Sequence, residues 1–286
     1  MIFEMAGKGR TAMAGALAVL LLTASPLAQA ASKNSPPPGP PPSYAALADL
    51  ADSAPLVLRA ELRKLALVEP ERAPGVRPGF GRFYAEARIK ALIAGNEVLG
   101  EAQRYLIDLP IDARGKPPPL TKKQVLLFAR SVPGQPGVLQ PVERDSQLLW
   151  DADTEARVRA ILAELRAPDA PGRISGVREA IHVPGALAGE GETQIFLATP
   201  NGSAASITVR RRPGANPAWG ASFSELTDNG VPPVRDTLAW YRLACFLPPA
   251  LPGGVNLSDT PQNRAQAALD YRLVIASLGS CPRTRG

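Results

Sequence analysis

Hydrophobic and polar residues alternate along two long stretches in the first half of the chain. In Leu56–Leu62 every second residue is apolar, and Arg59 and Glu61 lie on the other face; Arg82–Ala94 continues such an alternation over a longer stretch. A period of two is typical of a half-buried β-strand. After Leu62 the apolar positions resume at Leu65, three residues later. An odd spacing breaks the period of two and predicts one extra residue, a β-bulge.

Further strands are predicted at Gln103–Leu109, at Gln124–Ser131 and, as a shorter piece, at Gln147–Trp150. The prolines and glycines of Pro70–Phe80 predict a loop between the first two strands. Long bent strands in succession, with no helix among the first four, are typical of a small antiparallel barrel.

The periodicity then changes to that of a helix. Asp151 is a good capping residue before an acidic first turn. Apolar residues then recur on one face, at Val158, Ile161, Leu162 and Leu165. The proline-rich segment Ala167–Gly172 ends this helix, and we predict a domain boundary there.

The second half predicts a smaller unit. Two strands, Thr193–Thr199 and Ala205–Arg211, flank an Asn-Gly turn and predict a hairpin, and Trp219–Thr227 predicts a third strand. A helix is predicted from Asp236 to Phe246. Another is predicted from Pro261, at its first turn, to a closing glycine at 279. The fold class is therefore α+β, with a three-stranded meander and two helices in this half.

The pattern of the first half resembles the OB-type barrel of netrin-like domains, the fold of the tissue metalloproteinase inhibitors. The resemblance covers residues 45–150 and rests on Ala51-Asp52 before Leu56–Leu62, Phe83–Ile93 before Ala94-Gly95, Tyr105–Leu109 and Val125–Phe128. It implies an OB-like barrel. Together with the helix and the boundary predicted above, we expect a barrel with a closing helix at 45–167, followed by an α+β domain at 173–286. Those inhibitors act through an N-terminal cysteine, which this segment lacks. The resemblance therefore implies a barrel and not protease inhibition.

The first 30 residues predict export. Two basic residues precede an apolar run, Thr11–Leu22, and small residues follow at Ala28 and Ala30. This is the pattern of a secretory signal peptide, with a buried N-terminal helix as the alternative. The apolar run of about a dozen residues is short of the roughly 20 that cross a bilayer. Glu4 fits poorly in the basic N-terminal region of a signal peptide, which favours Met5 as the true start of translation. We predict a periplasmic or secreted protein with no transmembrane segment after cleavage.

Residues 31–44 predict a tether. The proline run in Ser35–Ser43 lacks amide protons and has a fixed φ, so it favours an extended polyproline II conformation. The alternative is a ligand for a proline-recognising groove.

The chain has two cysteines, Cys245 and Cys281, and one histidine, His182. In an oxidising compartment an isolated pair predicts one disulfide, with two free thiols as the alternative. Paired cysteines and a single histidine leave no ordinary zinc site, and the acidic residues lack a calcium-loop pattern. We predict no metal and no cofactor.

Candidate catalytic groups are few. A Ser–His–Asp triad would need His182, but no Gly-x-Ser-x-Gly elbow is present, so a strand-edge or surface histidine is the alternative. Paired carboxylates cleave glycosides in other proteins. The acidic residues of the second half that we considered also suit turns and caps: Glu225, Asp228 and Asp236.

Three aromatic residues define a candidate ligand groove, with core packing as the alternative: Trp219, Trp240 and Tyr241.

The net charge of the chain indicates which kinds of molecule it binds. The formal net charge is +6, and the one dense basic cluster, Arg210-Arg211-Arg212, has no interleaved aromatic residues. We interpret the cluster as the solvated end of a strand rather than a phosphate site.

Outside the cytoplasm, a mild positive charge favours an envelope protein or anionic envelope surface over nucleic acid as the partner. We predict a non-enzymatic exported envelope protein that binds or scaffolds a partner. The alternative is a carboxylate-dependent hydrolase of cell-wall polymers.

Overall fold

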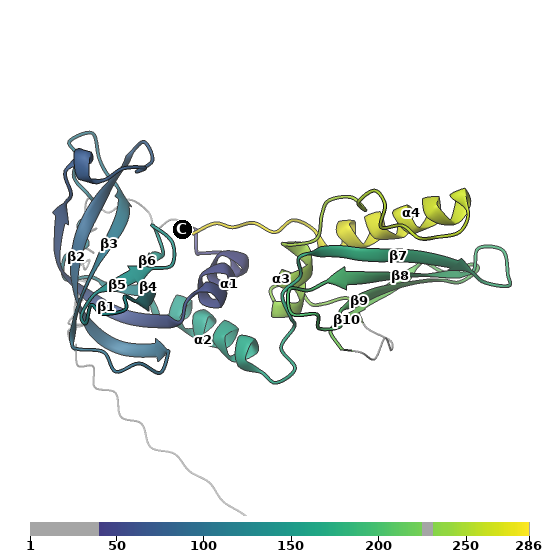
Figure 1. Ribbon diagram of the computed structural model, residues 1–286, viewed down its shortest axis with the longest axis horizontal. Helices are drawn as coiled ribbons and strands as arrows, with labels where there is room; N and C mark the ends of the chain where they lie inside the picture. Colours follow the sequence, from purple (N-terminus) through teal and green to yellow (C-terminus); the bar gives the residue numbers. More distant parts are fainter. Residues whose placement is uncertain (1–39, 225–230, 286) are drawn as a thin grey trace, which may run out of the picture. The chain divides into compact units, whose positions relative to one another are not determined.

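The computed structural model describes residues 40–224 and 231–285. They belong to one compact unit, Gly39–Gly286. Within this part of the chain, two antiparallel sheets and four α-helices form a mixed α+β fold (Figure 1). The predicted signal peptide and residues 31–39 of the predicted tether lie outside the described residues.

The first sheet has the strand order β3-β2-β1-β4-β5, and β6 pairs with β4. Its strands are β1 (Leu56–Leu67), β2 (Phe80–Ala94), β3 (Ala102–Pro110), β4 (Gln124–Ser131), β5 (Leu139–Pro141) and β6 (Gln147–Leu149). The four long strands and β6 lie where the hydrophobic pattern predicts them. The pattern does not predict β5, because three residues are too few to display a period of two. A single turn of 3-10 helix, η1 (Pro70–Arg72), lies in the predicted loop.

The predicted bulge in β1 is confirmed. The pairing of β1 with β2 shifts register between Leu62 and Lys64. A bulge bends a strand and increases its twist. The inward side chains of this sheet form a hydrophobic cluster of their own, which includes Leu58, Leu62, Phe83, Tyr105, Ile107 and Leu127.

The two outer strands of this sheet, β3 and β5, approach each other without forming a ladder. One isolated parallel bridge pairs Arg104 with Val138. The amides of Arg104 and Asp108 donate to the carbonyls of Gly137 (2.9 Å) and Arg144 (2.8 Å). Within residues 40–224 and 231–285, these contacts do not close the sheet into a barrel.

The second sheet has four strands, not the three predicted, in the order β10-β9-β8-β7. They are β7 (Gly176–Pro184), β8 (Gly191–Ala198), β9 (Ser206–Arg211) and β10 (Ala218–Ser222). The sequence pattern misses β7 because its register shifts between Val177 and Glu179, which breaks the period of two. Strand β10 ends at Ser222, and residues 225–227 of the predicted strand lie outside the described part.

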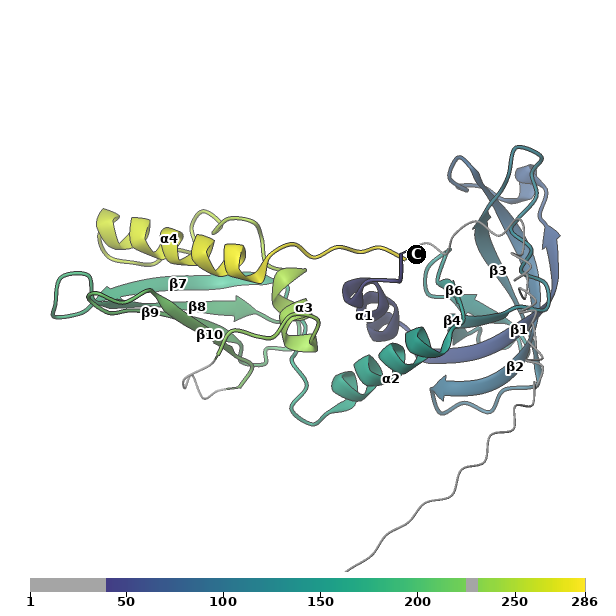
Figure 2. The ribbon, with the colours of Figure 1, turned by 180° about the vertical axis from the view of Figure 1, so that it is seen from behind.

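The helices are α1 (Tyr44–Ser53), α2 (Ala152–Arg166), α3 (Leu238–Ala244) and α4 (Pro261–Leu278). Helix α4 covers one face of the second sheet over β7 and β8 (Figures 1 and 2). Its predicted ends are confirmed, with Gly279 at φ 71°. Helix α3 begins two residues later than predicted, because Asp236 has φ 60° and the hydroxyl of Thr237 caps the helix.

Helix α1 is not predicted from the sequence. The hydroxyl of Ser43 accepts a hydrogen bond from the amide of Ala46 and caps it. The helix is ten residues long and directly follows the proline run, and its buried face combines Tyr44, Leu47 and Leu50 with four alanines. Tyr44, the last residue of the predicted tether, is its first residue and is buried.

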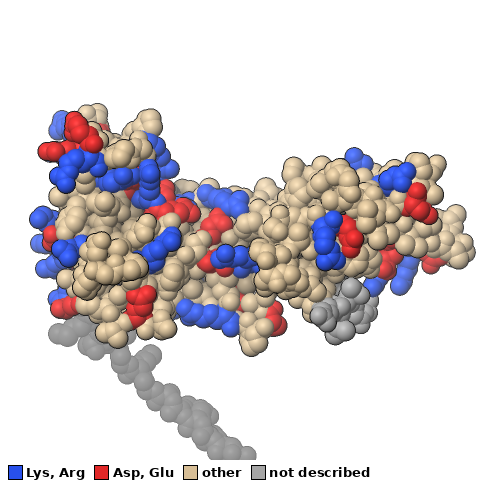
Figure 3. All heavy atoms as spheres, viewed as in Figure 1, with Lys and Arg blue, Asp and Glu red and all other residues tan. Residues whose placement is uncertain are grey.

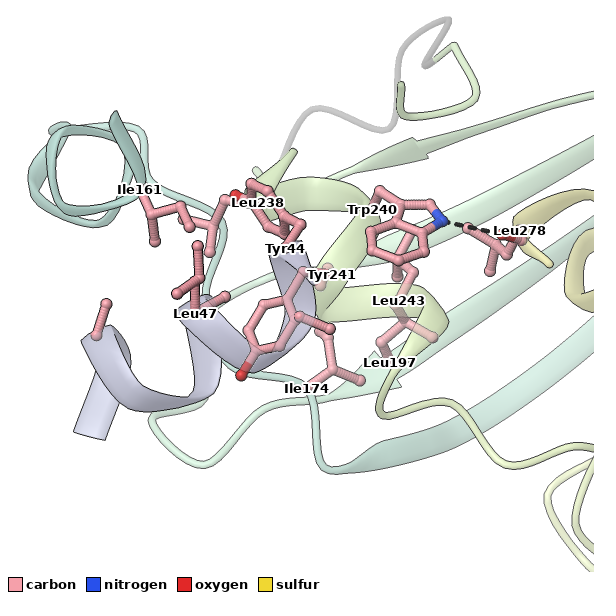
Figure 4. Packing of buried hydrophobic residues seen from close by; sticks show 14 of the residues in the cluster. Tyr44, Leu47, Ile161, Ile174, Leu197, Leu238, Trp240, Tyr241, Leu243 and Leu278 are labelled. Carbon is pink, nitrogen blue, oxygen red and sulfur yellow. Dashed lines mark hydrogen bonds between the residues drawn. The ribbon is translucent and has the colours of Figure 1, made fainter. Parts of the chain in front are cut away.

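Helices α1, α2 and α3 share one hydrophobic cluster with the second sheet. In Figure 4, Tyr44 and Leu47 of α1 lie near Tyr241 of α3, with Ile161 of α2 beside them. The predicted boundary at 167–172 falls in the connection between α2 and β7, and this cluster contains residues from both sides of it. The division into two domains stays a prediction.

The predicted disulfide between Cys245 and Cys281 is present, with a Cα–Cα distance of 5.3 Å. It joins the C-cap of α3 to the segment after α4. That segment extends to the start of α1, where the amide of Ser43 donates to the carbonyl of Thr284 at 2.9 Å (Figure 1). Among the described residues, no helix has the length and apolar character needed to span a bilayer.

Candidate functional site

A cavity of about 810 Å³ lies on the first sheet, beside the incomplete contact between β3 and β5. We call it the β3–β5 groove. Its lining comes from β2, β3 and the segment that leaves β4, passes through β5 and ends at Arg144: Arg82, Tyr84, Arg104, Tyr105, Leu106, Asp108, Val132, Gln135 and Val138–Arg144. The groove is therefore built by three segments that are distant in sequence.

The middle of the groove is apolar. Leu106 lies between Arg104 and Asp108 on the outward face of β3 and is 49% exposed. An outward position in a half-buried strand is normally polar. Val138 and Val142 line the same groove from the opposite wall. An apolar patch framed by polar residues is typical of an interaction site.

The carboxylates of the groove are ion-paired. Asp108 accepts hydrogen bonds from Nε and Nη2 of Arg82 at 2.7 and 2.9 Å. These hydrogen bonds raise the pKa of the Arg82 guanidinium. Glu143 pairs with Arg285 of the C-terminal segment.

Two arginines of the groove have no acidic partner in the described part of the chain. The guanidinium of Arg144 donates to the carbonyl of Gly75, and that of Arg104 forms no hydrogen bond or ion pair there. Arg104 lies at the Gly137 end of the contact between β3 and β5, and Arg144 lies at the Asp108 end. The groove thus carries an uncompensated positive charge at each end.

The backbone of β3 adds a hydrogen-bond donor between these charges. The amides of Arg104 and Asp108 both point toward β5. Because alternate amides of a strand point to the same side, the amide of Leu106 points there too. Within the described residues it has no backbone partner on that side. A ligand in the groove would therefore meet an unpaired strand edge at Leu106.

The three aromatic residues of the predicted ligand groove are instead buried in the core. Trp219, Trp240 and Tyr241 are 8%, 2% and 1% exposed. Trp240 Nε1 donates to the carbonyl of Leu278 at 2.9 Å (Figure 4). Trp219 Nε1 donates to Ser277 Oγ at 3.1 Å. All three side chains therefore pack in the core, which was the alternative prediction. Their polar atoms form hydrogen bonds, as buried tryptophan and tyrosine require.

The acidic candidates of the second half do not form a described site. Glu225 and Asp228 lie outside the described residues, and Asp236 precedes the cap of α3. In the part of the chain that the structure describes, no three His, Cys, Asp or Glu side chains are grouped to hold a metal ion.

His182 lies on the edge strand β7, as the strand-edge alternative states, but it is 6% exposed and is therefore not a surface residue. Its Nδ1 lies 2.8 Å from Thr193 Oγ1, and Thr193 donates to Asp270 Oδ2 at 2.5 Å. In a catalytic triad the histidine lies between the nucleophile and the acid. Here the hydroxyl lies between the histidine and the acid. This order cannot activate Thr193 as a nucleophile.

The basic cluster at the end of β9 is largely neutralised by ion pairs. Arg210 pairs with Glu192 at 3.0 Å, and Arg211 pairs with Asp270. Basic and acidic side chains are also interspersed over the face of the molecule shown in Figure 3.

The chain matches no known protein-family model and has no significant sequence similarity to any curated protein. Its function must therefore be argued from the chemistry of the groove. Sequence patterns did not single out the groove, because its residues come from three segments. The one local signal was Leu106, an apolar residue at an outward position of a predicted strand.

Proposed function

We propose that the protein is a non-enzymatic binding protein of the cell envelope whose β3–β5 groove holds an extended, acidic segment of a partner protein. The observation that carries the proposal is the placement of Arg104 and Arg144 at the two ends of an apolar groove, where neither has an acidic partner among residues 40–224 and 231–285.

The spacing of these groups defines the partner's pattern. Arg104 and Asp108 are four residues apart on β3, which is about 13 Å along a strand. Arg144 lies at the Asp108 end. Residues i, i+2 and i+4 of an extended segment lie on one side. The groove therefore suits an acidic residue, an apolar residue two positions later over Leu106, and a second acidic residue two positions after that. Arginine binds carboxylates through two parallel hydrogen bonds, which adds geometric selectivity.

The strand order supports the location. We propose that the first sheet is an open, OB-like barrel: its strand order is β3-β2-β1-β4-β5, and one isolated parallel bridge brings the two outer segments together without closing the sheet. OB folds bind oligonucleotides and oligosaccharides on the face of strands 2 and 3, together with the loops between strands 1 and 2 and between strands 4 and 5. The β3–β5 groove draws its lining from β2, β3 and the loop between β4 and β5.

We also propose export to the periplasm or the extracellular space after cleavage of residues 1–30. The disulfide between Cys245 and Cys281 supports this, since such bonds persist in oxidising compartments.

The competing proposal, hydrolysis of wall polymers, needs one protonated and one ionised carboxyl group. Asp108 and Glu143 of the groove both pair with arginines. Arg82 binds both oxygens of Asp108, so this carboxylate is not presented to a substrate. The groove therefore suits binding better than acid catalysis.

The test is a titration of the protein into a fluorescein-labelled peptide, Thr-Glu-Thr-Leu-Thr-Glu-Thr, followed by fluorescence anisotropy. We expect saturable binding that weakens as salt is added. The double variant Arg104→Glu/Arg144→Glu should bind at least about tenfold more weakly. Arg272→Glu, an exposed residue of α4, is the matched control and should bind like the wild type.

Replacing both glutamates of the peptide by glutamine should abolish binding. Equal affinity of the double variant and the control, or no binding by the wild type, would contradict the proposed function.

A further inference from the structure

A second polar site lies between α4 and the second sheet, remote from the β3–β5 groove. At its base is Asp270 of α4, whose side chain is fully buried. It accepts hydrogen bonds from Thr193 Oγ1 (2.5 Å), Arg211 Nε (2.7 Å) and Gln266 Nε2 (3.0 Å). In each of these three hydrogen bonds the carboxylate of Asp270 is the acceptor.

This arrangement determines the tautomer of His182. Because Asp270 only accepts, Thr193 donates its single hydroxyl proton to Asp270. The hydroxyl oxygen must therefore accept from Nδ1 of His182, 2.8 Å away. Burial lowers the pKa of His182, and the charge of Arg211 lowers it further against the opposing effect of Asp270. The neutral ring thus carries its proton on Nδ1 and a lone pair on Nε2.

The Nε2 lone pair has no hydrogen-bond partner among the described residues. His182 lines a cavity of about 270 Å³, together with Gly189, Glu190, Arg211, Gln262, Asn263 and Gln266. Gly191 makes room for the ring: a Cβ there would lie 2.7 Å from Cε1 and 2.9 Å from Nε2 of His182. The nearly buried ring that carries this acceptor is held by the chain Asp270–Thr193–His182 and lines the cavity.

The lining selects against ions. Arg211 is compensated by Asp270, and Glu190 adds a negative charge, so an anion finds no free positive charge. A metal ion would lack ligands, because no group of three His, Cys, Asp or Glu occurs in the described residues. An ammonium group only donates, and would leave the donors of Arg211 and the amides unmatched.

Hydroxyl groups match this lining, because each can both donate and accept. The three amide side chains also do both, Arg211 donates, and Nε2 accepts. The volume is near the lower limit for small-molecule sites, which start at about 300 Å³. We propose that this cavity binds one neutral sugar residue, with one of its hydroxyl groups donating to Nε2 of His182.

The test uses the single histidine as a probe. Protein labelled with ¹⁵N-histidine gives one imidazole spin system, and its nitrogen shifts should show a protonated Nδ1 and an unprotonated Nε2 in the free protein. Glucose, galactose and N-acetylglucosamine are then titrated separately into the millimolar range, with sodium sulfate and ethylammonium chloride as controls. We expect at least one sugar to shift Nε2 in a saturable way, and neither salt to do so.

Gln262→Ala removes one exposed amide of the cavity. It should weaken the sugar titration by severalfold while the imidazole shifts of the free protein stay unchanged. The inference is overturned if the free ring is protonated on Nε2, if none of the three sugars shifts Nε2, or if only a salt does. The proposal does not depend on peptide binding to the β3–β5 groove.

Discussion

Arg242 of α3 and Asp52 of α1 form a bidentate ion pair, with hydrogen bonds of 2.8 and 3.1 Å, although 190 residues separate them. The Arg242 side chain is 4% exposed, and its Nε also donates to the carbonyl of Pro171 at 3.2 Å. One buried guanidinium thus connects α1, α3 and the segment between α2 and β7. It fixes the helices that lie between the two sheets.

Replacing Arg242 by methionine should destabilise the protein by about 3 kcal/mol, because it leaves a partly buried carboxylate without its main partner. The remaining hydrogen bond from Arg173 to Asp52, 2.9 Å long, keeps the loss at the low end of the usual range. Urea denaturation measures the effect. Arg272→Met, at an exposed position, should change stability by less than about 0.5 kcal/mol. Similar values for both variants would contradict the structural role of Arg242.

The same pair makes stability depend on acid. Burial alone would raise the pKa of Asp52, but hydrogen bonds and charge from Arg242 and then Arg173 outweigh it and hold the pKa below its ordinary value. This stabilisation is present above the unfolded pKa of about 3.9 and is lost as the pH falls through the folded pKa.

In urea melts, the difference in unfolding free energy between wild type and Asp52→Asn should therefore stay constant at neutral pH and shrink below about pH 4. Asp169→Asn, an exposed site in the connection after α2, should show no such trend. A difference that does not change with acid would show that the ion pair does not set the pKa.

The disulfide should contribute to stability through the unfolded chain. It closes a loop between residues separated by 36 positions. The chain-entropy relation gives about 4 kcal/mol for this loop length. The variant Cys245→Ser/Cys281→Ser should lose roughly this amount in urea denaturation. Two alkylatable thiols in native, unreduced protein would contradict the bond itself.

The single histidine should give a second pH dependence. Burial lowers the folded pKa of His182 below its ordinary value of 6.5, so below that pH the unfolded chain binds a proton that the folded chain does not. Stability should be full above about pH 6.5 and fall as the pH drops toward the folded pKa. The charged groups that face the ring are Asp270, Arg211 and Glu190. His182→Gln should remove the slope in this range, and an unchanged slope would exclude His182 as its source.

The sequence predicted the elements whose signals are local and regular. The bulge of β1 follows from an odd spacing of leucines, and both ends of α4 follow from Pro261 and Gly279. It failed where the signal is weak or interrupted. Helix α1 is ten residues long and begins directly after a proline run, β5 is three residues long, and a register shift hides β7.

Contacts between residues that are distant in the sequence were even harder to predict. Nothing local connects Arg104 with Arg144, or His182 with Asp270, because each pair meets only after its strands and helices have packed. The aromatic residues were conspicuous in the sequence but serve the core. The groove depends on one leucine at an outward position, which sequence periodicity alone treats as an irregularity.

The most direct test of the β3–β5 groove is the amide hydrogen exchange of Leu106, measured residue by residue by NMR with and without the acidic peptide. Pairing of the peptide with the free edge of β3 should slow this amide strongly and leave amides of β9 in the second sheet unchanged. Bound peptide with unaltered exchange at Leu106, or with protection confined to the second sheet, would contradict the account.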